Sequence, residues 1–129
     1  MPPTEVRFYA ESDGSSPVIA WLQDLRRRDL RAFGACRARI LLLAALGHEL
    51  RRPHADLLRD GIYELRSRVG SVNYRILYFF HGKNIAIVAH GITKERAVPP
   101  REIERALERK RRYEQAPSTH VASINPQDL

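Results

Sequence analysis

Cysteine is almost absent from this chain: Cys36 is the only one among 129 residues. A single cysteine cannot form an internal disulfide, which is typical of a protein in a reducing compartment, and we predict a cytoplasmic location. The first residues carry neither the basic nor the apolar region of a secretory signal. The longest strongly apolar run, residues 40–46, is too short to cross a bilayer.

Motifs that define several catalytic classes are also missing. The five histidines are scattered, and no H-x-x-x-H, H-E-x-x-H or paired-cysteine spacing occurs, which argues against a metal site. The chain has no G-x-G-x-x-G, G-x-x-x-x-G-K-[ST] or G-x-S-x-G run, so neither a nucleotide-dependent enzyme nor a serine hydrolase is indicated. We therefore predict neither a metal nor a cofactor.

Lysine is scarce, whereas arginine is abundant: only three of the 22 basic residues are lysines. The formal net charge is +7, which favours an anionic partner, with nucleic acid first. Arginine makes planar, bidentate contacts with phosphate that lysine cannot make. A genome rich in arginine codons would give the same composition, and composition alone leaves both explanations open.

The spacing of apolar residues predicts a single α+β domain over residues 1–115. Helix starts are indicated by Ser16-Pro17, Asp29 and Pro99-Pro100, and a helix end by Gly47. The predicted elements are a strand at 6–10, helices at 17–28 and 30–46, a polar connector at 48–59, strands at 62–68, 73–81 and 85–92, and a helix at 100–115. Residues 116–129 show no periodicity, and we predict a disordered tail.

Arginines lie within strands that are otherwise apolar. The period of two places Arg75 on the face opposite the aromatic residues of its strand, where pairing beside Arg66 would make a cationic patch. Lys94 and Arg96 follow the next strand and are placed to reach the same surface. Such a patch can bind phosphate and stabilise charge during phosphoryl transfer. Alternatively, Arg66 pairs with a nearby glutamate as a structural bridge, and these residues alone favour general anion binding over catalysis.

Five runs occur in a characteristic order: S-P-V-I-A-W-L-Q-D-L (16–25), G-I-Y-E-L-R (61–66), Y-R-I-L-Y-F-F (74–80), H-G-I-T-K-E-R (90–96) and P-R-E-I-E-R-A (100–106). Together they resemble the phage-derived, HigB-like branch of the RelE/ParE superfamily of bacterial toxins, over about residues 5–114. The resemblance implies a small RelE-like α+β fold. Its curved, mostly antiparallel sheet would have about four strands, with two N-terminal helices packed on one face and a C-terminal helix.

The same resemblance implies the toxin of a type II toxin–antitoxin system. Such toxins are metal-independent endoribonucleases that cleave ribosome-bound mRNA and so inhibit translation. The 2′-hydroxyl attacks the scissile phosphate and leaves a 2′,3′-cyclic phosphate. The implied partners are the message, the ribosome and a small helix-turn-helix, HigA-like antitoxin, which together with the toxin binds operator DNA. No membrane partner is implied.

Carried over residue by residue, the resemblance implies that Arg75 binds the scissile phosphate and that Lys94 is a second cationic catalytic residue. It gives further catalytic roles to Arg66 and His90. We also predict five RNA-binding arginines: Arg51, Arg52, Arg59, Arg68 and Arg96.

This chain departs from the family pattern where many relatives have a late tyrosine or histidine as a proton donor, because Pro99 and Pro100 occupy that region. The resemblance therefore leaves the proton-transfer residue unassigned. The alternative functions are a non-catalytic protein that binds nucleic acid and antitoxin in transcriptional autoregulation, and a gyrase-inhibiting toxin of the same fold.

Overall fold

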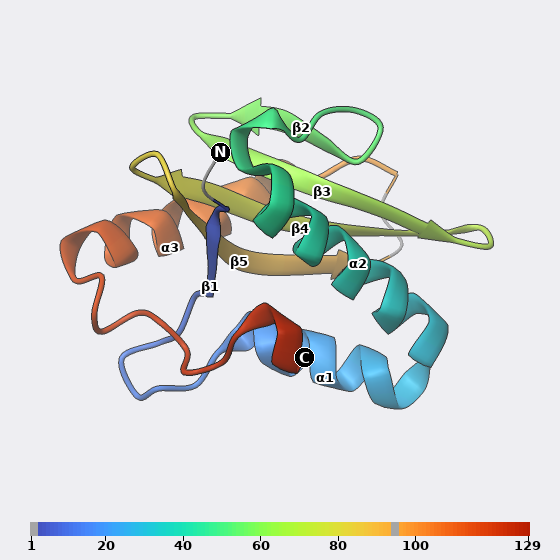
Figure 1. Ribbon diagram of the computed structural model, residues 1–129, viewed down its shortest axis with the longest axis horizontal. Helices are drawn as coiled ribbons and strands as arrows, with labels where there is room; N and C mark the ends of the chain where they lie inside the picture. Colours follow the sequence, from blue (N-terminus) through green and yellow to red (C-terminus); the bar gives the residue numbers. More distant parts are fainter. Residues whose placement is uncertain (1–2, 94–95) are drawn as a thin grey trace.

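The computed structural model describes residues 3–93 and 96–129, which form a central sheet between two helical layers (Figure 1). The sheet has five strands in the order β1-β5-β4-β3-β2. Its edge strand β1 runs parallel to β5, and the other neighbours are antiparallel. The strands are β1 (Glu5–Phe8), β2 (Ala55–Arg59), β3 (Ile62–Val69), β4 (Val72–His81) and β5 (Ile85–Thr93).

The three long helices begin and end where the sequence predicts. The oxygen of Ser16 accepts the Ile19 amide at 3.3 Å at the start of α1 (Pro17–Arg28), and Asp29 accepts the Ala32 amide at 3.0 Å at the start of α2 (Leu30–Leu46). These caps satisfy amides that have no partner inside a first helical turn. The third helix, α3 (Pro100–Gln115), begins with its proline, and two short 3₁₀ helices follow α2 and precede the last residue: η1 (Gly47–Glu49) and η2 (Pro126–Asp128).

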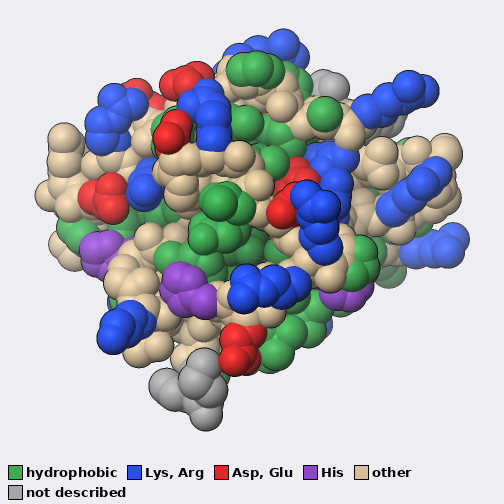
Figure 2. Space-filling view, turned by 90° about the horizontal axis from the view of Figure 1, so that it is seen from above, with side chains coloured by type: hydrophobic (Ala, Val, Ile, Leu, Met, Phe, Trp, Pro, Cys, Tyr) green, Lys and Arg blue, Asp and Glu red, His purple; other side chains and the backbone are tan. Residues whose placement is uncertain are grey.

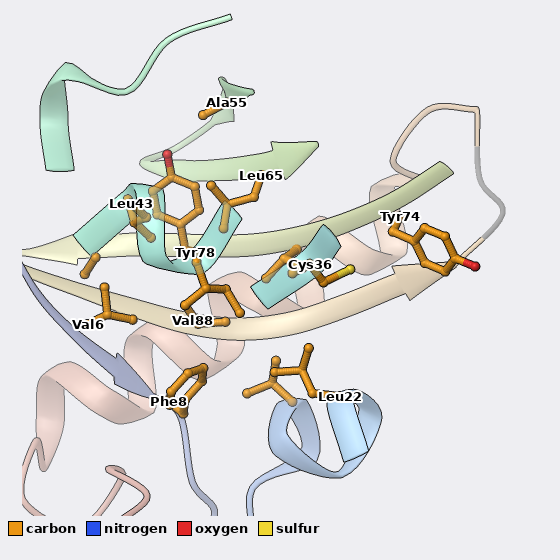
Figure 3. Packing of buried hydrophobic residues seen from close by; sticks show 14 of the residues in the cluster. Val6, Phe8, Leu22, Cys36, Leu43, Ala55, Leu65, Tyr74, Tyr78 and Val88 are labelled. Atoms are coloured by element: carbon orange, nitrogen blue, oxygen red, sulfur yellow. The ribbon is translucent and has the colours of Figure 1, made fainter. Parts of the chain in front are cut away.

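Two hydrophobic clusters hold the layers together, one on each face of the sheet. Helices α1 and α2 cover one face, where Leu22, Cys36 and Leu43 pack against Leu65, Tyr78 and Val88 (Figure 3). Helix α3 covers part of the other face, where Ile103, Ala106 and Tyr113 pack against Ile62, Leu77 and Phe79. Alternate residues of β4 therefore face opposite helical layers, and this strand is buried on both sides.

The sheet has one strand more than the resemblance implied. Strand β2 lies within the segment that we predicted to be a polar connector, and it pairs with β3 through a turn in which Asp60 and Gly61 have positive φ angles. A register shift between Leu57 and Arg59 interrupts the alternation of side chains, so the usual strand pattern is absent from this edge strand. The mostly antiparallel arrangement and the packing of two N-terminal helices on one face are confirmed.

The segment after α3 differs from the prediction of a disordered tail. Its chain returns toward α1 and α2 (Figure 1), and Val121 bridges antiparallel to Tyr9 at the outer edge beside β1. The Ala122 amide donates to the Phe8 carbonyl at 2.9 Å, and the Ala10 amide donates to the His120 carbonyl at 3.0 Å. Backbone hydrogen bonds of this kind do not depend on a periodic pattern of apolar side chains, so the sequence pattern could not predict that this segment is ordered.

None of the described helices is both long enough and apolar enough to span a membrane.

Candidate functional site

Arg66 and Arg75 are direct partners across the antiparallel pair of β3 and β4. Both side chains are on the same face of the sheet as Leu77, which α3 covers further along the strand. The structure therefore confirms the predicted proximity of these two arginines. Figure 2 views the molecule from above the orientation of Figure 1, where β2 and β3 lie, and it shows Lys and Arg side chains distributed over that surface with acidic side chains among them.

A buried glutamate fixes the two arginines. Glu64 is only 2% exposed; its oxygens accept Nη1 of Arg75 at 2.8 and 2.9 Å, and Oε1 lies 3.0 Å from Nε of Arg66. Arg75 also donates to the carbonyl of Arg96. The structural bridge that the sequence left open is thus present, and one buried carboxylate holds the two guanidinium groups side by side.

The two arginines line a groove of about 430 Å³. It lies at the edge of β3, because β2 begins at Ala55 opposite Leu65 and no described strand pairs with the rest of that edge. Arg39 reaches it from α2 and donates from Nε to the Arg66 carbonyl at 2.9 Å. The groove is lined, among the described residues, by no carboxylate at all: its walls are Arg39, Pro53, His54, Arg66, Ser67, Arg68, Asn73, Tyr74 and Arg75. This composition suits a phosphate group.

The other predicted RNA-binding arginines are placed differently. Only Arg68 of that set lines the groove, and its Nε donates to the Gly70 carbonyl at 3.1 Å. Arg52 pairs with Asp56 at 2.7 Å, and Arg59 pairs with Asp60 at 3.0 Å and with a glutamate of α3. Arg51 and Arg96 are likewise outside the groove lining. Lys94 lies outside the described residues.

His90 is held beneath α3 and does not line the groove. Its Nε2 hydrogen-bonds to Glu102, and Nη1 of Arg109 approaches Nδ1 at 3.1 Å while donating to the Ala89 carbonyl at 2.6 Å. Because a guanidinium can only donate, Nδ1 must accept and Nε2 must carry the proton, which describes a neutral imidazole. Burial is the main reason that the pKa of His90 lies below its ordinary value. Both ring nitrogens are therefore occupied.

The pKa values of the two charged partners of His90, Arg109 and Glu102, are also lowered. Burial is also the main cause that lowers the pKa of Arg109. For Glu102, burial alone would raise the pKa of the carboxyl, but the hydrogen bond from His90 and the charges of Arg105 and Arg101 together hold it below its usual range. The cluster is thus a carboxylate, a neutral imidazole and a guanidinium that join β5 to α3.

Three features of the site were not predicted from the sequence. Arg39 lies beside the apolar stripe of α2, and His54 lies in the segment that we treated as a polar connector. Neither position differs in sequence pattern from an ordinary surface residue. The third feature is the burial of Glu64, which follows from the pairing of β3 with β2 on one side and β4 on the other. The one available sequence signal for it was the strand alternation that places Glu64 on the same face as Arg66.

Comparison with known proteins matches one family model, described as phage derived protein Gp49-like (DUF891), to residues 20–111 of the chain. The matched range extends from α1 into α3 and includes every residue that lines the groove. None of the curated proteins compared matches the chain.

Proposed function

The chain belongs to the Gp49-like family of phage-derived proteins, which is a RelE/ParE-like toxin family, and from this premise we propose that it is the toxin of a type II toxin–antitoxin system. Within that superfamily we assign it to the HigB-like branch. Its proposed partner is a small helix-turn-helix antitoxin of the HigA type, which neutralises the toxin and carries the complex to operator DNA.

The proposed activity is metal-independent cleavage of mRNA on the ribosome. The observation that supports it is the side-by-side placement of Arg66 and Arg75 in a groove whose described lining includes no carboxylate. Paired guanidinium groups can hold the scissile phosphate through bidentate hydrogen bonds and stabilise the negative charge that develops on its oxygens. The RNA supplies the nucleophile: its 2′-oxygen bonds to phosphorus as the bond to the 5′-oxygen breaks. Lys94 is the proposed second cation.

A second candidate is binding of nucleic acid without cleavage. It is favoured by the bridge through Glu64, which balances one of the two arginine charges, and by the engagement of both nitrogens of His90. In this case the protein would act with its antitoxin at operator DNA only.

Expression of the chain in bacteria without its antitoxin tests the proposal. We expect growth arrest, and we expect the purified protein to cut message on translating ribosomes and to leave 2′,3′-cyclic phosphate ends. Arg75→Ala and Lys94→Ala should relieve the arrest. Arg27→Ala is the matched control, because this exposed arginine of α1 pairs with Asp24 and lies outside the groove. Intact message together with an operator shift by the complex would favour the second candidate.

A further inference from the structure

One histidine lines the arginine groove, and it differs from the other four in its contacts. His48 stacks on Phe80 with ring centroids 3.6 Å apart, and His81 meets the edge of Tyr113. His120 is buried with Nδ1 2.7 Å from the Ala10 carbonyl, and His90 is held by α3. His54 lies in the groove wall, and no described residue hydrogen-bonds to its ring.

His54 is placed beside Arg66 by a backbone hydrogen bond. The Arg66 amide donates to the His54 carbonyl at 2.8 Å, which joins the two residues just before β2 begins. The half-buried His54 side chain therefore shares one groove with Arg66 and Arg75. Histidine is the side chain that most often moves protons near neutral pH.

Arg39 is a second unassigned group in the same groove. Its Nε donates a hydrogen bond to the Arg66 carbonyl. No carboxylate among the described residues forms an ion pair with the Arg39 guanidinium. This contrasts with Arg75 and Arg66, which share Glu64. Arg39 therefore brings to the wall formed by α2 a positive charge that no described carboxylate pairs with.

We propose that this groove is the RNA subsite of the enzyme, with His54 as its general base and Arg39 as the ligand of the phosphate next to the scissile one. The inference rests on the proposed ribonuclease function. It names the proton acceptor that the family resemblance left unassigned, and it places the RNA backbone along the open edge of β3.

The step balances without any further reagent. Neutral His54 accepts the proton of the 2′-hydroxyl while the 2′-oxygen bonds to phosphorus, and the bond from phosphorus to the 5′-oxygen breaks. The leaving 5′-oxygen takes its proton from water. The charged and titratable groups that share the groove are Arg39, Arg66, Arg68, Arg75 and Tyr74, and Asp56 next to it is paired with Arg52.

The first test is single-turnover cleavage of ribosome-bound message between pH 5 and pH 8. We expect the wild-type rate to rise with pH and reach a plateau, and His54→Gln to lose about 100-fold or more in rate together with that rise. His48→Gln is the matched control, because His48 packs on Phe80 outside the groove, and it should keep the wild-type profile.

The second test is binding of a short RNA whose 2′-hydroxyls are replaced by hydrogen, so that cleavage cannot occur. Arg39→Gln should weaken binding about tenfold and make the log–log salt dependence shallower by about 0.7. Arg37→Gln is the control on the same helix, where Arg37 donates to the Gln127 carbonyl away from the groove. Thermal unfolding of each variant shows whether it is folded.

The outcomes separate the two proposals. If wild-type protein cuts message and His54→Gln keeps both its rate and its pH profile, His54 is not the base, although the ribonuclease function stands. Wild-type protein that leaves message intact would overturn the ribonuclease function and the role of His54 together. An unchanged RNA affinity of Arg39→Gln would overturn the placement of the RNA, whichever result cleavage gives.

Discussion

Two polar clusters lie on the α3 side of the sheet, and each is built around a glutamate. Glu64 sits between Arg66 and Arg75 on neighbouring strands, whereas Glu102 of α3 bonds to His90, which Arg109 contacts from its other side. The first cluster faces a groove, and its described residues are two arginines and one glutamate. The second is closed beneath a helix.

The comparison shows that burial and ionic pairing do not by themselves indicate a functional site. A group can act on a ligand only if it retains hydrogen-bonding capacity that the ligand can reach. Arg66, with 40% of its side chain exposed, keeps that capacity. Arg75 is 10% exposed and His90 is 12% exposed, so the two clusters differ in reach through Arg66, while both ring nitrogens of His90 already have partners on α3. The resemblance assigned catalytic roles to residues of both clusters, and the following substitutions discriminate between them.

Replacing one arginine in each cluster should give the largest difference. Arg75→Gln should slow message cleavage by about 100-fold or more, because a neutral amide cannot stabilise the charge on the phosphate. Arg109→Gln should change the cleavage rate of folded protein by less than about threefold, since Arg109 contacts His90, the Ala89 carbonyl and the ring of Tyr9, which all lie outside the groove lining. Single-turnover rates measure both, and equal losses would remove the distinction between the clusters.

The two glutamates should differ in their effect on RNA affinity. Glu64→Gln should lower the free energy of unfolding by about 3 kcal/mol, because two guanidinium groups lose their shared buried counterion. It should also tighten binding of an uncleavable RNA, as one negative charge leaves the edge of the groove. Glu102→Gln should cost about 1 kcal/mol and leave RNA affinity unchanged. Urea unfolding measures the stability changes, and RNA titrations measure the affinities. Weaker RNA binding by Glu64→Gln would contradict the predicted gain in affinity.

His90→Gln should have a smaller effect and one confined to stability. The amide can keep only part of the contact between β5 and α3, so we expect a loss of about 1 kcal/mol in the free energy of unfolding. Cleavage by the folded variant should stay within about twofold of wild type. A stable variant that has lost cleavage tenfold or more would mean that His90 acts in catalysis, as the family resemblance implies.

The pH dependence of stability should be the smallest effect. Since burial lowers the pKa of His90 in the folded protein, the unfolded chain binds the proton first, and stability falls as pH drops below the ordinary histidine value of about 6.5. Above that value His90 is neutral in both states and contributes no slope. Urea unfolding of wild type and of His90→Gln between pH 7.5 and 5.5 measures this pH dependence. If the free energy of unfolding of the variant changes equally with pH, the dependence belongs to other groups.

The helices could be predicted to the residue because their signals are local. Ser16 and Asp29 accept amides of the following helical turn, and Pro100 supplies a first helical position without a free amide. The strands predicted at 62–68 and 73–81 lie within one residue of β3 and β4 for a similar reason, as their alternation of side chains matches their two faces.

The parts that could not be predicted depend on contacts between distant residues. Strand β2 is recognisable only from its pairing with β3, since it is short and has a register shift between Leu57 and Arg59. The position of Arg66 beside Arg75 followed from strand alternation, but the groove around them required α2 to bring Arg39 against β3. No local pattern gives that arrangement.

The place of β1 in the sheet also affects how the protein can be made. Strand β1 is translated before the other strands of the sheet, yet its neighbour is β5, and its other edge meets residues 120–122. Because domains fold as they leave the ribosome only when their contacts have been synthesised, this strand must wait for nearly the whole described chain. The complete sheet therefore cannot form before β5 has been synthesised, and any partner that recognises the finished surface would meet it only after that point.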